Sequence, residues 1–171
     1  MTHHTVSVEL ENKPGALARV SQMFARRGYN IESLAVGPTE RPDVSRITLR
    51  VDCSRESLEQ LEKQMHKLVN VLRVSTLEAG EAVERELALV KVNAPPNRRG
   101  ELMALGEVFN ARVADLGPDS IVFEIVGHPE EVSSFEELVR PHGLKELART
   151  GRIGLGRASA GRAPRTQHVL R

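Results

Sequence analysis

The sequence predicts an α+β fold made of two βαββαβ modules in tandem. Short segments with strand and helix periodicity follow one another in the order β, α, β, β, α, β over about 80 residues, and the same order then begins again. With 171 residues, the chain has room for two small domains of about 80 residues each. We expect modules at residues 4–79 and 83–157, and a flexible arginine-rich tail at residues 158–171.

The first half of the first module predicts a strand, a helix and a second strand. Residues 6–10 alternate apolar and polar side chains, as a half-buried strand does. Pro14 suits a first helical turn, where its missing N–H has no intrahelical partner to lose. The helix then carries apolar residues at helical spacing: Leu17, Val20 and Phe24. Gly28 is expected to end the helix, residues 30–36 to form the next strand, and residues 37–43 to form a loop with two prolines.

The second half of this module completes the order. Residues 47–51 alternate like a strand, and Ser54 is a suitable N-cap for the helix that follows. That helix has a single apolar stripe: Leu58, Leu61, Met65 and Leu68. Residues 71–77 are expected to close the sheet. This βαββαβ order is the ferredoxin-like arrangement.

The second module repeats the order without repeating the residues. Residues 87–92 form the first predicted strand, and the loop Asn93-Ala94-Pro95-Pro96-Asn97 repeats the Asn-x-Pro pattern 81 positions after Asn12. Further strands are expected at residues 111–116, 120–126 and 144–150, with helices at residues 102–109 and from Pro129 onward. We therefore predict a second ferredoxin-like module, joined to the first near Gly80.

Composition excludes several classes of protein. Lys and Arg number 24 against 23 Asp and Glu, so no overall charge favours nucleic acid or a membrane surface. Cys53 is the single cysteine, which rules out an internal disulfide and suits a reducing cytoplasm. No apolar run approaches the roughly 20 residues that a membrane helix needs, and the N-terminus does not resemble a signal peptide. We expect a cytoplasmic protein.

The loop from Asn12 to Leu17 is the first candidate for a binding site. A helix that starts after a glycine-containing loop presents unpaired N–H groups and the positive end of its dipole, which together suit a carboxylate. Asn12 and Asn30 offer side-chain oxygens for an ammonium group, and we expect the topology to bring this loop and the start of the second strand to neighbouring edges. On residue types alone, a turn that serves only backbone geometry is an equal alternative.

The remaining glycine and histidine patterns favour a structural role over a catalytic or ligand-binding one. The Gly151–Gly156 stretch resembles a phosphate loop, but no long helix pattern follows it. His3 and His4 have no partner at metal-ligand spacing, so a flexible terminus is expected there and no metal site. His66 fits the negative end of a helix dipole. We expect no catalytic residue, no cofactor site and no metal site in this chain.

Several long motifs in order resemble the small, regulatory subunits of acetolactate synthase (acetohydroxyacid synthase), over roughly residues 4–158. Asn12-Lys13-Pro14-Gly15-Ala16-Leu17 resembles an ACT domain, an amino-acid sensing module. Two further segments narrow the resemblance to this family: Arg27-Gly28-Tyr29-Asn30-Ile31-Glu32-Ser33-Leu34 and Gln64-Met65-His66-Lys67-Leu68-Val69-Asn70-Val71-Leu72-Arg73-Val74. Two shorter ones agree with it: Val83-Glu84-Arg85-Glu86-Leu87 and Glu146-Leu147-Ala148-Arg149-Thr150-Gly151.

The resemblance implies a non-catalytic chain that dimerises through its ACT domains. It would activate a separate catalytic large subunit, which holds thiamine diphosphate, magnesium and FAD, and confer feedback inhibition by valine, leucine or isoleucine bound between two ACT domains. By motif, the effector-binding residues would be Asn12, Gly15, Ala16 and Leu17 of one chain with Asn30 and Ile31 of the facing chain.

Two alternatives remain at this stage. A stand-alone double-ACT amino-acid sensor would regulate transcription or another enzyme, but no DNA-binding helix pair or basic face is evident before the tail. An autonomous enzyme would need a convergent acid, base or metal set, and the spacing of the residues reveals none.

Overall fold

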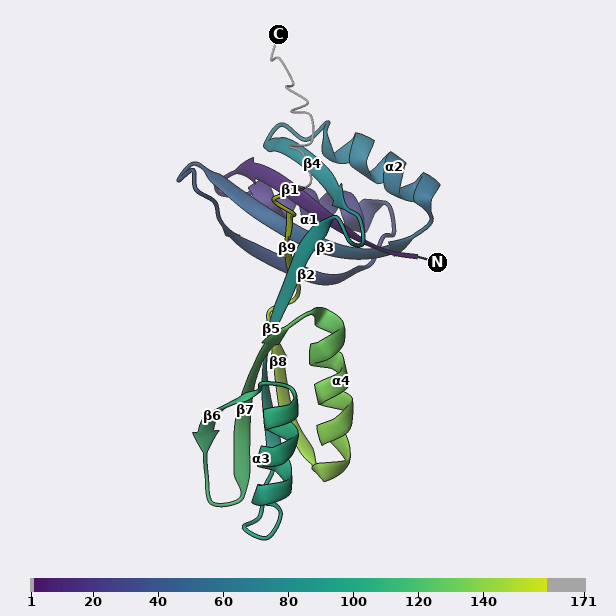
Figure 1. The fold of residues 1–171 in the computed structure, drawn as a ribbon. Helices are drawn as coiled ribbons and strands as arrows, with labels where there is room; N and C mark the ends of the chain where they lie inside the picture. The colour runs from purple at the N-terminus through teal and green to yellow at the C-terminus, as the bar shows by residue number, and fades with distance from the viewer. Residues whose placement is uncertain (1, 160–171) are drawn as a thin grey trace. The chain divides into compact units, whose positions relative to one another are not determined.

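The computed structural model describes residues 2–159, and its chain divides into two compact units (Figure 1). Among the described residues, the first comprises residues 2–83 together with residues 152–159, and the second comprises residues 84–151. Apart from residues 158–159, which form a turn, the predicted tail lies outside the described residues.

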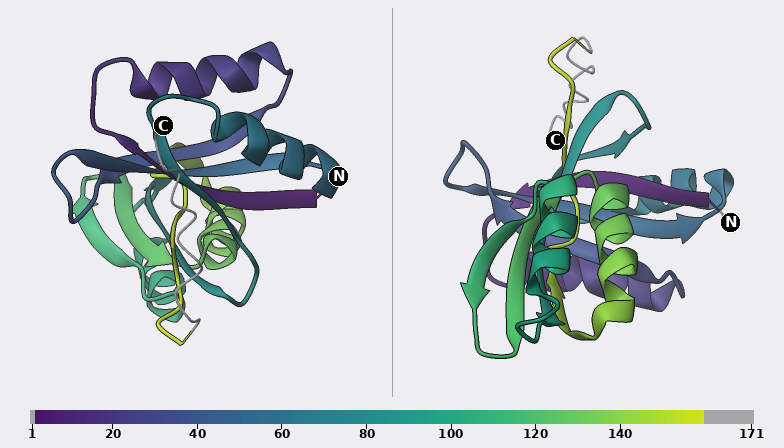
Figure 2. Two further views of the ribbon diagram at one scale, coloured as in Figure 1. Left: turned by 90° about the horizontal axis from the view of Figure 1, so that it is seen from above. Right: turned by 60° about the horizontal axis from the view of Figure 1, so that its bottom comes forward.

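The first unit is a four-stranded antiparallel sheet with two helices. Its elements are β1 (Thr2–Glu11), α1 (Ala16–Arg26), β2 (Ile31–Pro38), β3 (Val44–Cys53), α2 (Arg55–Met65) and β4 (Val71–Leu77). The strand order β2-β3-β1-β4 is the one that the ferredoxin-like arrangement requires. Figure 2 shows α1 and α2 on the same face of this sheet, where they bury a core that includes Val8, Phe24 and Leu61.

The second unit repeats this topology, as the sequence predicted. Its elements are β5 (Ala82–Asn93, whose first two residues belong to the first unit), α3 (Arg99–Val108), β6 (Arg112–Leu116), β7 (Ser120–Gly127), α4 (Pro129–Val139), a short 3-10 helix (Arg140–His142) and β8 (Leu144–Arg149). The order β6-β7-β5-β8 matches the first sheet. Its core is separate and includes Val90, Phe123 and Phe135.

The described elements differ from the prediction in three places. Pro14 precedes the helix instead of lying in its first turn, because Gly15 has a φ of 81° and α1 begins only after it. His3 and His4 belong to strand β1, so the expected flexible terminus is wrong. An unpredicted strand, β9 (Ile153–Gly156), belongs to the first unit, where the Arg157 N–H donates to the Glu81 carbonyl at 2.8 Å.

Candidate functional site

The loop between β1 and α1 leaves backbone donors without acceptors. The Asn12 N–H donates to the Asp43 carbonyl at 2.8 Å and the Ala16 N–H to the Lys13 carbonyl at 3.2 Å. Among the described residues, no acceptor faces the amides of Gly15, Leu17 and Ala18. Unpaired amides in a first helical turn point outward along the helix axis and favour an anion.

Gly15 is the residue that gives this loop its shape. Its φ of 81° lies in the left-handed region, which L side chains rarely adopt. A Cβ atom placed on Gly15 would meet no atom within 4 Å, so the space in front of the loop is open. The helix start is therefore accessible to a ligand, and a side chain at this position would project into that space.

The start of α1 differs from the starts of the other α-helices in residues 2–159. In α2, the Ser54 side chain caps the helix and Glu56 occupies the first turn. The first turns of α3 and α4 contain the acidic residues Glu101, Glu130 and Glu131. Helix α1 has neither a side-chain cap nor an acidic residue in its first turn. Among the α-helices of residues 2–159, α1 is thus the one whose positive dipole end has no carboxylate in its first turn.

Two side chains at the loop are held by hydrogen bonds and ion pairs. The Asn12 Nδ2 donates to the Pro42 carbonyl at 3.2 Å, and in the described part of the chain no donor reaches its Oδ1, which is an available acceptor. Glu11 accepts from Asn70 Nδ2 at 2.7 Å and from Lys13 Nζ at 3.1 Å. The Asn70 hydrogen bond, followed by the contacts with Lys13, lowers the pKa of the Glu11 carboxyl below its ordinary value. Because Lys13 is paired with Glu11, it adds little net positive charge to the loop.

The predicted site residues fall into two groups at opposite ends of the sheet. Asn12, Gly15, Ala16 and Leu17 lie at the end where Glu11 pairs with Val44. Ile31, which follows Asn30, pairs with Val51. Val44 and Val51 are seven positions apart on β3, a separation of about 23 Å at roughly 3.3 Å per residue. The expectation that one chain brings the loop and the start of β2 to neighbouring edges is therefore wrong.

A pocket of about 350 Å³ lies elsewhere in the first unit. Its lining includes Glu9, Arg46, Arg73 and Arg157, and none of the predicted site residues contributes to it. In the described part of the chain, every helix falls short of the length and apolar character that crossing a bilayer requires.

Both halves of the chain match models of known protein families. The family model of the AHAS small subunit-like ACT domain matches residues 6–73, and the model of the small subunit of acetolactate synthase matches residues 85–158. Together they span most of the two units.

Whole proteins of this kind are similar over nearly the full chain. A probable acetolactate synthase small subunit of Archaeoglobus fulgidus is 48% identical over 156 residues, which are 91% of this chain and 98% of that protein. The acetolactate synthase small subunit of Mycolicibacterium smegmatis is 43% identical over 92% of this chain and 93% of its own.

The fold of the described residues also matches a solved structure of this kind. The crystal structure of the acetolactate synthase small subunit from Thermotoga maritima aligns with a TM-score of 0.85 at 36% identity, covering 92% of this chain and 98% of that one. The tandem fold, the two family models and the close relatives agree. The chain therefore belongs to the family of acetolactate synthase small subunits, the regulatory subunits of that enzyme.

Proposed function

We propose that this chain activates the catalytic large subunit of acetolactate synthase and makes it sensitive to feedback inhibition by a branched-chain amino acid. The effector is valine, or its homologues leucine and isoleucine, bound between the first units of two chains. Membership of the small-subunit family supports the role. The observation that supports the site is the start of α1, whose unpaired amides and open space suit the carboxylate of a free amino acid.

The two groups of site residues meet if two chains pair through β2. This strand is an edge of its sheet, because among the described residues it pairs with β3 alone. Its far end, Pro38, pairs with Ser45, close to the Asn12 loop. An antiparallel pairing of β2 with the β2 of a second chain would place the start of one strand beside the end of the other. Asn30 and Ile31 of the second chain would then lie beside the Asn12 loop.

Exposed apolar side chains on β2 fit such a pairing. Leu34 and Val36 are 38% and 48% exposed. Their direct partners on β3, by contrast, are fully buried. An edge strand with free backbone groups and apolar side chains is a template for pairing with another chain. We therefore propose a homodimer with a continuous sheet across the two first units.

Each part of an amino-acid zwitterion has a partner in this arrangement. The amides of Leu17 and Ala18 would donate to its carboxylate, and the free Oδ1 of Asn12, with Asn30 of the facing chain, would accept from its ammonium group. Leu17, which is 39% exposed, and Ile31 would contact the aliphatic side chain. One methylene in such an apolar pocket changes binding by only about 1–3 kcal/mol, so related amino acids compete.

The chemistry of the reaction belongs to the partner in this proposal. Thiamine diphosphate, magnesium and FAD would be bound by the catalytic large subunit, and this chain would act by changing that subunit's conformational equilibrium. Coupling free energies between such sites are typically about 1–3 kcal/mol. The free, buried thiol of Cys53 is compatible with the reducing cytoplasm, where we place the complex.

Thermal unfolding with and without ligands tests the sensor. With the purified chain, valine, leucine or isoleucine at ten times Kd is expected to stabilise the fold by about 1.4 kcal/mol, which raises the Tm by a few degrees for units of this size. Glycine, which has the same charged groups without the apolar side chain, is the control and should give a smaller shift. Equal shifts with glycine, or no shift at millimolar valine, would argue against the proposed pocket.

A further inference from the structure

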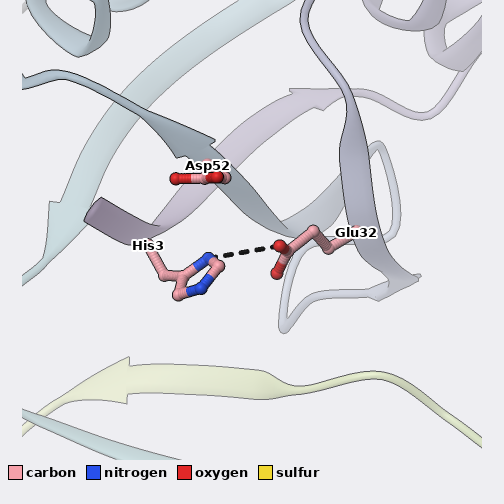
Figure 3. Close-up of side chains that lie close together, drawn as sticks. All are labelled: His3, Glu32 and Asp52. Carbon is pink, nitrogen blue, oxygen red and sulfur yellow. Dashed lines mark ion pairs between the residues drawn. The ribbon is translucent and has the colours of Figure 1, made fainter. Parts of the chain in front are cut away.

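Three metal-ligating side chains lie together on the sheet of the first unit, away from the helix start described above. They are His3, Glu32 and Asp52, and their ligand atoms all lie within 4.8 Å of one another. In Figure 3, the His3 imidazole faces the Glu32 carboxylate, and Asp52 lies next to both. The His3 Nδ1 is 3.2 Å from the Glu32 Oε1.

The sheet brings these residues together from positions 29 and 20 residues apart in the sequence. His3 and Asp52 are direct partners in the antiparallel pairing of β1 with β3, so their side chains share a face. Glu32 lies on β2 where the register shifts between Ile31 and Ser33, and it has no direct partner there. A shift of this kind reorients the side chain at the extra residue. Here that side chain joins His3 and Asp52.

The distances suit a small divalent cation. Zinc binds imidazole nitrogen and carboxylate oxygen at about 2.0–2.2 Å, which puts neighbouring ligand atoms of a tetrahedral site about 3.3–3.6 Å apart. The His3–Glu32 separation of 3.2 Å is already close to that value. The Asp52 oxygen lies within 4.8 Å of the other two ligand atoms, so rotation of the side chains is needed to bring all three atoms to bonding distance.

Two further observations support a bound cation. The Asp52 Oδ1 is buried and finds no hydrogen-bond partner within residues 2–159, although a buried carboxylate oxygen without a partner is costly. Glu32 is also held from its other side, since its Oε2 forms an ion pair with Arg50 Nε at 2.9 Å. That ion pair engages Oε2 and leaves Oε1 on the side of His3.

We propose that His3, Glu32 and Asp52 form a binding site for a transition-metal dication of the zinc class. One imidazole nitrogen and two carboxylate oxygens are ligands that such ions accept. Water completes the coordination, because His3 and Glu32 are partly exposed to solvent. The bound ion ties β1, β2 and β3 together at the end of the sheet where β2 begins, two residues after Asn30. The site shares no residue with the proposed amino-acid pocket, although Glu32 directly follows Ile31.

Zinc titration of the untagged full-length chain tests this site. Isothermal titration calorimetry is expected to show one zinc ion per chain with a micromolar Kd. Cobalt bound in its place should give visible absorption bands from the ligand field. His3→Ala and Asp52→Asn should each weaken zinc binding at least tenfold, and Asp52→Asn does so while keeping the shape of the side chain.

A matched histidine provides the control. The His128 Nε2 lies 3.8 Å from Glu84 Oε2 and its Nδ1 lies 4.0 Å from Glu130 Oε2, so the two carboxylates face different ring nitrogens. Within the described residues, His128 belongs to no group of three ligand atoms that converge on one point. His128→Gln should therefore leave zinc affinity unchanged. The proposal is overturned if zinc binds only weakly and without saturation up to 1 mM. It is also overturned if either His3→Ala or Asp52→Asn binds zinc as tightly as the wild-type chain.

Discussion

At the scale of single residues, Gly15 has the two properties that the proposed effector site needs. Its left-handed backbone turns the chain into α1, and its missing side chain leaves the amides of the first turn uncovered. A carboxylate added at this position would lie in the space that the ligand's own carboxylate needs. The effect of charge is separable from that of backbone strain, because asparagine has nearly the shape of aspartate without the charge.

Gly15→Asp is expected to abolish valine binding and feedback while leaving activation of the catalytic subunit largely intact. We expect the Kd for valine to rise at least tenfold, about 1.4 kcal/mol, measured by calorimetry and by inhibition of the reconstituted enzyme. Gly15→Asn is the control, since it imposes a similar left-handed strain of about 1–2 kcal/mol without the charge, and it should retain more of the affinity. Full inhibition of the Gly15→Asp enzyme by valine would show that the effector binds elsewhere.

At the scale of elements, Arg149 on β8 pairs with Glu86, a buried acidic residue on β5 of the second unit. It donates to both carboxylate oxygens of Glu86, at 3.0 and 2.7 Å, and Glu86 is only 7% exposed. Its guanidinium also reaches Glu136 at 3.3 Å and Ser133 at 3.2 Å. The pKa of Arg149 is raised above its ordinary value, chiefly by the hydrogen bond to Glu86.

Arg149→Met is expected to lower the free energy of unfolding by about 3 kcal/mol, because it leaves the buried Glu86 charge without a partner. Chemical denaturation of the full chain measures this loss. Arg112→Met is the matched control: Arg112 forms an exposed pair with Glu124, and exposed pairs contribute about 1 kcal/mol or less. Equal losses in the two variants would contradict the role assigned to Glu86.

A second prediction about elements concerns the edge strand β2 as the dimer contact. Replacing Leu34 and Val36 together by lysine puts like charges on the proposed dimer contact, where they would lie close to their copies across a two-fold axis. We expect a dimer for the wild-type chain and a monomer for the double variant in light scattering after size-exclusion chromatography.

A variant on a different element controls for added surface charge. Val108→Lys changes an apolar residue on α3 that is 75% exposed, and it should remain dimeric. A dimer that survives both lysines on β2 would mean that the chains associate through another surface.

Some elements were predictable from the sequence because their signals are local. The Ser54 side chain caps α2 by accepting from the Ser57 N–H at 3.2 Å, and Pro129 opens α4 as expected. Strand β9 was missed because its four residues include two glycines, which are typical of a turn. Its strand partner is β5, about 70 residues earlier along the chain. Periodicity does not encode pairing at that distance.

The candidate sites show the same limit. The Asn12 loop was predictable from its residue types, because asparagine, proline and glycine at that spacing specify a turn before a helix. Its separation from Asn30 follows from the β-α-β order itself, because β1 and β2 run parallel and the end of β1 therefore lies at the opposite end of the sheet from the start of β2. The grouping of His3 with Glu32 and Asp52 depends instead on strand register, which the residues around His3 do not encode.

At the scale of the whole molecule, the last described residues of the chain belong to the first unit. The Arg157 Nε donates to the Gly80 carbonyl at 2.8 Å, and an Arg152 nitrogen to the Thr5 Oγ1 at 3.3 Å. A chain cut after Gly80 therefore loses contacts of its own unit as well as the entire second unit. The first unit still keeps its complete core of sheet and two helices.

A fragment of residues 1–80 is expected to dimerise and to activate the catalytic subunit, but to transmit inhibition poorly. We expect its Tm to lie below that of the first unit in the full chain, because residues 152–157 no longer contact it. Calorimetry measures the Tm, and reconstitution with the catalytic subunit measures activation and inhibition. Full feedback through the fragment would show that the second unit is not needed for the coupling.

Reconstitution of the complete enzyme tests the proposed function most directly. The rate of acetolactate formation from pyruvate is measured for the catalytic large subunit alone, with this chain added, and with this chain and millimolar valine. We expect this chain to raise the rate and valine to lower it again, with no effect of valine on the catalytic subunit alone. A rate that this chain leaves unchanged, or an activated rate that none of valine, leucine and isoleucine lowers, would contradict the proposed function.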